Sequence, residues 1–150
     1  MLHAPSSLKL SGIAVKLLGV YKIWHTVAPH IPKMLRYSLG VRIDSLFAEI
    51  VELTASAQFS PEKERGAIIG KAIAKNDLLK FMLYALFELN GIEEAHFIKL
   101  APEIEEIGKM LYGWKRRAEK ESSSTCASAF VHIGRQKGIC DKCGRKPISV

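Results

Sequence analysis

The segment from Asn76 to Leu89, NDLLKFMLYALFEL, limits the fold of this 150-residue chain more than any other. After its first turn, the polar side chains are Lys80, Tyr84 and Glu88, which are spaced four residues apart and share one narrow stripe of a helix. A helix on the outside of a single bundle usually has an apolar stripe of about 100° or slightly more. This helix is apolar over a far wider arc, so we expect it either at the centre of its domain or covered by another subunit.

The ends of this helix are marked by residues with strong positional preferences. Asn76 and Asp77 suit a helix cap followed by an acidic first turn, and Gly91 is a natural helix stop. Upstream, Pro61 followed by acidic residues is typical of a helix start. We therefore expect a helix that begins near Pro61 and continues into this segment.

Three further apolar stripes step by three and four residues, the spacing of a helix. Together with the segment above they predict four helices, over about 8–28, 33–58, 61–89 and 93–119. The first two are separated by the proline-containing connector PHIP. No stretch of useful length alternates as a strand would, so the expected fold class is all-α: an up-down-up-down four-helix bundle within residues 1–120.

Pro102 lies inside the fourth helix, and we expect a kink there, near Leu100. A five-helix fold, with a break at Gly70 or Pro102, is the leading alternative. In an up-down bundle the first and third connectors share one end. That end would combine imidazoles and cations with carboxylates, namely His25, His30, Lys33, Arg36, Glu88, Glu93 and Glu94.

Residues 121–150 begin with the serine-rich run ESSST and end in CDKCGRKPISV, the composition of a flexible basic tail. Cys140 and Cys143 have the two-residue spacing with which two thiolates reach one tetrahedral metal ion. Cys126 and His132 would have to complete such a zinc site, at a looser spacing. The alternative is a tail with free thiols, and three cysteines do not make a disulfide framework. We predict no bound cofactor.

The chain has a formal net charge of +7 and an isoelectric point of about 9.4, which favours an anionic partner without identifying it. The charge is uneven, with +5 over residues 1–44, −5 over 45–108 and +7 over 109–150. The longest apolar runs are short and are interrupted by Lys9, Lys16 and Lys22. We therefore expect no membrane-spanning helix, no signal peptide and a cytoplasmic protein.

Two groups of basic residues are candidates for contacts with nucleic acid. One lies near the start of the second helix and the other on the last helix, and they comprise Lys33, Arg36, Arg42, Lys109, Lys115, Arg116 and Arg117. Cations near a helix C-terminus also stabilise the helix dipole, which is a purely structural explanation for the second group. Because no base-reading motif accompanies them, binding is expected to be to phosphates, weakly sequence-specific and steeply dependent on salt.

Catalysis has little support in the sequence. Asp44, Glu49 and Glu52 share a helix, but a solvated helix face explains them. The pair Glu93 and His96 has the spacing used in di-iron bundles, but such motifs occur in pairs and this one is single. There is no glycine-rich phosphate loop. We therefore expect no enzymatic activity.

Several motifs resemble one known family. They are the runs Leu39–Phe47, LGVRIDSLF, Asp77–Phe81, DLLKF, and Glu106–Trp114, EIGKMLYGW, with the connector PHIPK at Pro29–Lys33. In order and spacing they are similar to the accessory variability determinant of diversity-generating retroelements. That family is a group of four-helix-bundle proteins related to those encoded in intervening sequences of bacterial large-subunit ribosomal RNA genes.

The resemblance implies a homopentameric barrel of bundles with a basic surface. It implies partners as well: the reverse transcriptase of the element and its template RNA or cDNA, whose mutagenic copying diversifies a target gene. It implies an accessory role without catalysis. The over-apolar third helix agrees with an oligomer, and Phe81 and Phe87 are its candidate interface residues, with burial in the core as the alternative for each. A bundle that binds only a protein partner, as an adaptor or a structural protein related to ribosomal RNA, is the alternative function.

Overall fold

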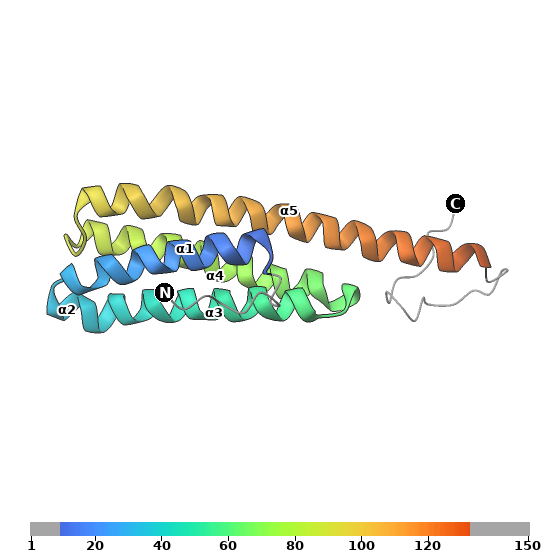
Figure 1. Ribbon diagram of the computed structural model, residues 1–150, viewed down its shortest axis with the longest axis horizontal. Coiled ribbons are helices and arrows are strands. Elements are labelled where there is room, and N and C mark those ends of the chain that lie inside the picture. The colour runs from blue at the N-terminus through green and yellow to red at the C-terminus, as the bar shows by residue number, and fades with distance from the viewer. Residues whose placement is uncertain (1–9, 133–150) are drawn as a thin grey trace.

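The computed structural model describes the backbone of residues 10–132 and the side chains of residues 10–123. All elements in this part of the chain are helical (Figure 1). The elements are α1 (Gly12–Val27), η1 (Ala28–His30), α2 (Lys33–Leu35), η2 (Arg36–Gly40), α3 (Val41–Phe59), α4 (Glu62–Glu88) and α5 (Glu94–His132). Since α2, η2 and α3 follow one another without a gap, they form one helical segment, and the fold has four main helices.

The main differences from the sequence-based bounds are in the second and fourth helices. The π-helical turn η2, Arg36–Gly40, interrupts the regular α-helix expected over 33–58. α5 runs through Pro102 and continues to His132, well past the expected end near Glu119. Gly70 does not break α4 either, so the five-helix alternative is not observed. Residues beyond His132, including Cys140 and Cys143, lie outside the described residues.

Asn76 is not a helix cap, contrary to the expectation from its position. It lies in the middle of α4 and is fully buried. Its side-chain Nδ2 donates a hydrogen bond of 3.2 Å to the backbone oxygen of Ile104 in α5. Gly108 makes room for this amide, since a Cβ at Gly108 would lie 2.9 Å from Asn76 Nδ2. The asparagine therefore fixes how α4 and α5 pack, in a position that otherwise takes an apolar side chain.

One apolar core runs between the four helices. Trp24 of α1, Phe47 of α3, Leu83 of α4 and Leu100 of α5 are each at most 1% exposed. The ring of Phe47 stacks on Tyr21 at a centroid distance of 5.2 Å and meets Trp24 at 6.1 Å, which joins α1 to α3. Burial of these large side chains is the main stabilising contribution in a fold of this size.

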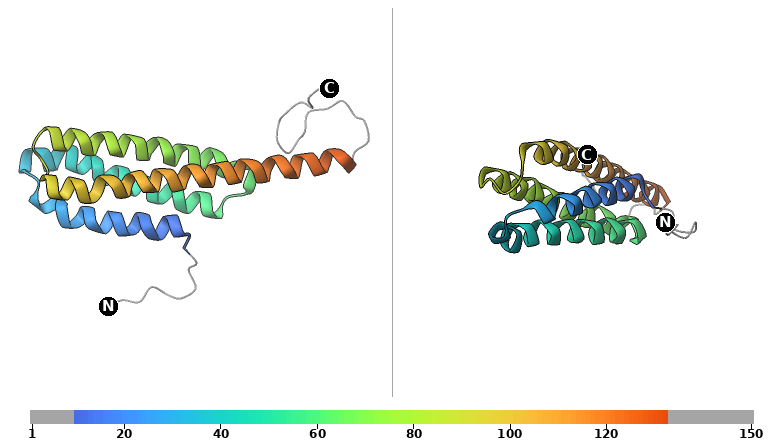
Figure 2. Two further views of the ribbon diagram at one scale, coloured as in Figure 1. Left: turned by 90° about the horizontal axis from the view of Figure 1, so that it is seen from above. Right: turned by 60° about the vertical axis from the view of Figure 1, so that its left-hand side comes forward.

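Each main helix packs against two others: α4 lies beside α3 and α5, and α1 lies beside α3 and α5 (Figures 1 and 2). The connector between α1 and α3 and the connector between α4 and α5 meet at one end, which we call the connector end. At the opposite end α5 projects past the other helices (Figure 2). Within residues 10–132, none of the helices combines the length and apolar character needed to cross a bilayer.

Candidate nucleic-acid interface

The structure places the two predicted groups of basic residues far apart. Lys33, Arg36 and Arg42 belong to the connector end or the first turns of α3. Arg116 and Arg117 lie on α5, about 33 Å along the helix from its start at the connector end, given a rise of about 1.5 Å per residue. The two groups of one chain therefore do not form a single patch.

Arg116 and Arg117 are two cations of α5 that are available to a partner. Both are exposed, and neither makes a hydrogen bond or an ion pair with any residue whose side chain is described. Lys115, by contrast, lies against α4, where its Nζ would be 3.7 Å from a Cβ at Gly70, and it faces Glu119 at 3.9 Å. The two arginines can thus contact an anion without losing an internal partner.

The cations of α5 are part of a longer exposed stripe. Lys109, Tyr112, Arg116 and Lys120 follow one another by three or four residues, and all four are exposed. Tyr112 is 52% exposed and stands between two cations, so a single aromatic ring is available for stacking. Among the described side chains, Lys109 is paired with Glu105 alone, at 3.3 Å in an exposed ion pair of little energetic weight. Tyr112 and Lys120 were not among the predicted site residues, although their helical spacing from Lys109 and Arg116 points to them.

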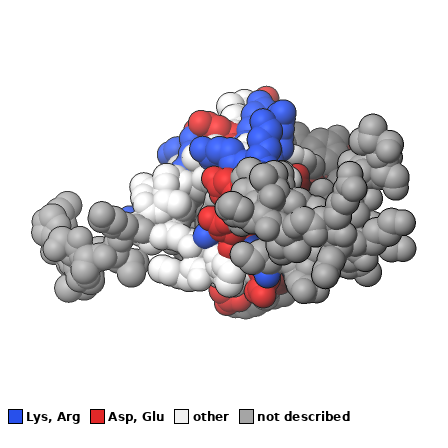
Figure 3. Space-filling model, turned by 90° about the vertical axis from the view of Figure 1, so that its right-hand side faces the viewer, with Lys and Arg blue, Asp and Glu red and all other residues white. Residues whose placement is uncertain are grey.

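Figure 3 shows the end of the molecule at which α5 projects. Lysine and arginine side chains gather at the upper edge of this view, with carboxylates beside and below them. An uncharged area of the described surface adjoins them. The basic surface is therefore local and mixed with acidic groups, which favours contact with a few phosphates over a broad electrostatic footprint.

At the connector end, Arg36 has a structural role. Its guanidinium donates hydrogen bonds to two backbone carbonyl oxygens of the first connector. The distances are 3.1 Å from Nε and 2.8 Å from Nη2 to Ile31 O, and 2.5 Å from Nη2 to Pro29 O. Lys33 is exposed and has no partner among the described side chains, so only Lys33 of this group is as available as the arginines of α5.

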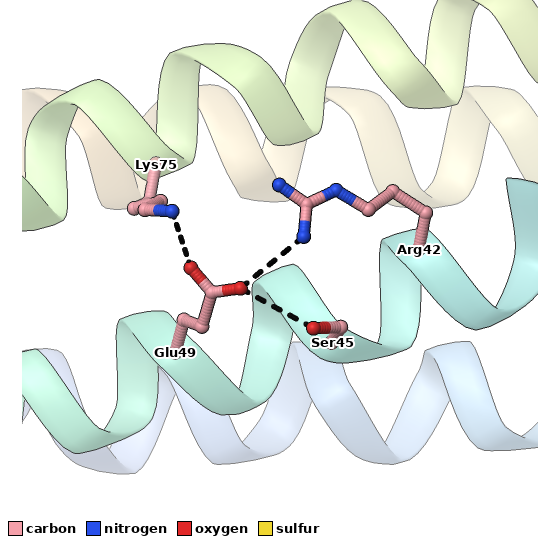
Figure 4. A network of polar contacts seen from close by, with 4 residues as sticks. All are labelled: Arg42, Ser45, Glu49 and Lys75. Carbon is pink, nitrogen blue, oxygen red and sulfur yellow. Dashed lines mark hydrogen bonds and ion pairs between the residues drawn. The ribbon is translucent and has the colours of Figure 1, made fainter.

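Arg42 is held in a network centred on Glu49 (Figure 4). Glu49 Oε2 lies 2.5 Å from Lys75 Nζ of α4, and Oε1 accepts hydrogen bonds from Arg42 Nη1 at 3.4 Å and Ser45 Oγ at 3.2 Å. The bond from Lys75 is the main reason that the pKa of Glu49 lies below its ordinary value of 4.5. The network ties α3 to α4 and leaves Arg42 less free to bind a phosphate.

The two predicted interface phenylalanines occupy different environments. Phe81 is 68% exposed on α4, close to the half-exposed Tyr84. Phe87 packs against the core, and its ring stacks on Phe97 of α5 at a centroid distance of 4.5 Å. Phe81 is thus available to a second molecule, whereas Phe87 belongs to the packing of its own chain.

Among the described residues, no group of three or more His, Cys, Asp and Glu side chains is placed to hold a metal ion. The predicted zinc ligands Cys126 and His132 fall in the part of α5 whose side chains lie outside the described residues, as do Cys140 and Cys143 entirely. Asp44 and Glu49, two carboxylates of α3, each face a partner on another element: His25 at 3.7 Å and Lys75.

No protein-family model matches this chain, and no curated protein is significantly similar to it in sequence. The resemblance to the accessory variability determinants therefore depends on the motifs themselves.

Proposed function

We propose that this protein is a non-enzymatic accessory factor of a diversity-generating retroelement. In this role it binds the reverse transcriptase and the template RNA or its cDNA and supports mutagenic copying. The observation that supports this best is the exposed stripe on α5: its Arg116 and the neighbouring Arg117 have no partner among the described side chains. The motif resemblance supplies the biological context.

The proposal includes a homopentameric barrel of up-down-up-down bundles. Its physical support is the surface of α4 and of Leu89, the residue that follows it, where apolar side chains remain exposed: Leu78 at 37%, Phe81 at 68%, Tyr84 at 51% and Leu89 at 57%. An exposed apolar surface of this kind is typical of a protein–protein contact. A pentamer would also repeat the basic stripe of α5 five times, which strengthens attraction to a polyanion.

The RNA part of the proposal is tested with a double variant and a matched control. Arg116→Gln with Arg117→Gln removes two unpaired cations from α5. Lys22→Gln with Lys99→Gln removes the same charge from exposed positions on α1 and near the start of α5, both outside the two predicted groups of basic residues. RNA affinity is measured by fluorescence anisotropy over a range of salt concentrations.

The arginine variant should bind all RNAs more weakly. Its salt slope should become shallower by about 0.7–0.9 for each phosphate that the variant no longer neutralises, while the lysine control changes little. Equal weakening in both variants would show that net charge alone matters. An affinity that hardly changes between low and physiological salt would contradict binding through phosphates.

The assembly is tested with the two phenylalanines of α4. Phe81→Glu should reduce the molar mass measured by light scattering while the helical circular dichroism signal is retained. Phe87→Glu should instead unfold the chain, because its ring is packed on Phe97. A wild-type protein that is monomeric at micromolar concentration would contradict the pentamer.

The alternative function is a bundle that binds only a protein partner, and the exposed apolar side chains of α4 favour it as much as they favour a pentamer. A reverse-transcriptase gene and a template repeat next to the gene for this protein would favour the retroelement role. Co-purification of the reverse transcriptase with this protein, combined with no RNA binding by this protein on its own, would favour the adaptor.

A further inference from the structure

A pocket of about 480 Å³ lies at the connector end, between the first connector and the connector from α4 to α5. Its apolar lining includes Val27, Ile31 and Phe87, and its polar lining includes His30, Glu93, Glu94 and His96. His30 comes from η1 and His96 from the first turn of α5, so the two imidazoles meet only in the folded chain. We propose that this pocket binds a divalent transition-metal ion such as Zn²⁺ through the Nε2 atoms of His30 and His96.

The hydrogen bond of His30 determines which of its nitrogens is free. Its Nδ1 lies 3.1 Å from the backbone oxygen of Thr26. A carbonyl oxygen can only accept a hydrogen bond, so the proton of the neutral ring is on Nδ1. Nε2 therefore has the lone pair. A metal-binding histidine usually has this arrangement, in which the other ring nitrogen donates to a backbone carbonyl or a carboxylate.

His96 has a carboxylate beside the corresponding nitrogen, at a distance longer than a hydrogen bond. Its Nδ1 lies 3.9 Å from Glu93 Oε2, one turn earlier in the chain. The negative charge of Glu93 favours a proton on Nδ1 and leaves Nε2 as the ligand atom. In His30 a hydrogen bond, and in His96 a nearby negative charge, favours a proton on Nδ1 and leaves Nε2 as the ligand atom.

The distance between the rings suits a shared ion. The centroids of His30 and His96 are 6.0 Å apart. With metal–nitrogen bonds of about 2.0–2.1 Å, two imidazoles on one tetrahedral or slightly opened site have centroids about 5–6 Å apart. Both side chains are at least partly solvent-accessible, so each ring has room to turn toward a shared ion.

The charges around the pocket favour a cation over an anion. Glu93 and Glu94 line it, while the nearby guanidinium of Arg36 is bound to Pro29 O and Ile31 O. Since no third His, Cys, Asp or Glu among the described residues is placed to complete the set, water would fill the remaining positions. A site with two protein ligands is exchangeable. Its effect is to join η1 to the start of α5, and so to stabilise the folded state in which both ligands are close.

The test uses the full-length protein with the other candidate ligands removed. In the background variant, Cys126, Cys140 and Cys143 are changed to serine, and His3 and His132 are changed to alanine. The three remaining histidines are His25, His30 and His96. Zn²⁺ binding is measured by isothermal titration at neutral pH, and thermal unfolding is followed with and without Zn²⁺.

We expect one Zn²⁺ per chain and a higher melting temperature when it is bound. His30→Ala and His96→Ala should each weaken binding by more than about tenfold, since loss of a ligand costs at least as much as loss of its orienting partner. His25→Ala is the matched control and should bind as the background does, because His25 lies outside the pocket. If an alanine variant fails to fold, His30→Gln or His96→Gln replaces it in the same binding measurement.

The proposal is wrong if the background variant binds no Zn²⁺, or if folded His30 and His96 variants bind it unchanged. RNA binding is not part of this test, so its result is independent of the proposed function.

Discussion

At the connector end of the bundle, Arg36 donates its hydrogen bonds to carbonyl oxygens of the adjacent turn. On the outer half of α5, Arg116 and Arg117 have no partner among the described side chains. The same residue type is thus part of the fold in one region and available to a partner in the other.

The difference has a physical cause in the backbone. At the connector end the chain passes through the short helix η1 and the residues 31 and 32, which leaves the carbonyl groups of Pro29 and Ile31 outside any long helix. A guanidinium with five donors satisfies such groups well. In the middle of α5 the carbonyl groups are already bonded within the helix, so its arginines extend into solvent. A cation in a sequence is therefore a better candidate for binding when the backbone around it is regular.

The largest effect expected from the difference between the two regions is on folding stability. Arg36→Ala should lower the free energy of unfolding by about 1.5–3 kcal/mol, because the variant lacks a charged donor and leaves the partly buried carbonyl group of Ile31 without this donor. Arg116→Ala should change it by less than about 0.5 kcal/mol. Urea denaturation of both variants measures the difference. Similar values for the two arginines would mean that Arg36 is as dispensable to the fold as the cations of α5.

A second pair of variants tests how tightly the two regions are packed. The same change, glycine to alanine, is made once in each region. A Cβ at Gly91 would clash with Leu86 Cδ1 and lie 2.8 Å from Leu35 Cδ1, so Gly91→Ala should cost about 1–3 kcal/mol. Gly113 is exposed in α5, and a Cβ there has no atom within 4 Å. Gly113→Ala should therefore stabilise the protein by about 0.5–1 kcal/mol, since alanine loses less entropy in a helix. Thermal unfolding of the two variants should shift in opposite directions, and a shift in the same direction would refute this explanation of the packing.

The smallest effect concerns the ion pairs of Glu49 on α3. Glu49 pairs with Arg42, so this cation, like Arg36 at the connector end, has a partner within the fold. Because the pKa of Glu49 in the folded chain is below its ordinary value of 4.5, its contribution is present above that pH and is lost as the pH falls through the lowered pKa. Glu49→Gln should thus destabilise the protein by less than about 1 kcal/mol at pH 7 and by nothing measurable in strong acid. Glu52→Gln is the control, as Glu52 is exposed on the same helix without a described partner. An effect of Glu49→Gln that is the same at both pH values would contradict the ion pair.

Much of the fold follows from local patterns. The stripes that step by three and four residues predict the helices, and the core side chains Leu46, Ile50, Leu100 and Ile104 are on them. The excess of apolar residues on the third predicted helix is also real, because Phe81 and Leu89 remain exposed in the single chain. The expected cap at Asn76 is wrong because the residue is bonded to a carbonyl of another helix, a contact that no local rule contains.

The candidate site was predictable only in part. Composition and charge indicate that Arg116 and Arg117 lie on the basic last helix, but they cannot distinguish these arginines from Arg36. That distinction depends on which carbonyl groups the turns leave free, and on which cations lie beside a carboxylate of another helix.

The sequence by itself determines the helical character of this protein, because side-chain periodicity acts over a few residues and needs no distant partner. It also determines the net positive charge and its concentration at the two ends of the chain. Only the tertiary structure decides which polar groups meet across helices: Asn76 with Ile104, Glu49 with Lys75, and His30 with His96. Such pairs are separated by many residues, and their distances are set by how the helices pack and where the connectors turn, not by the spacing of the residues along the chain.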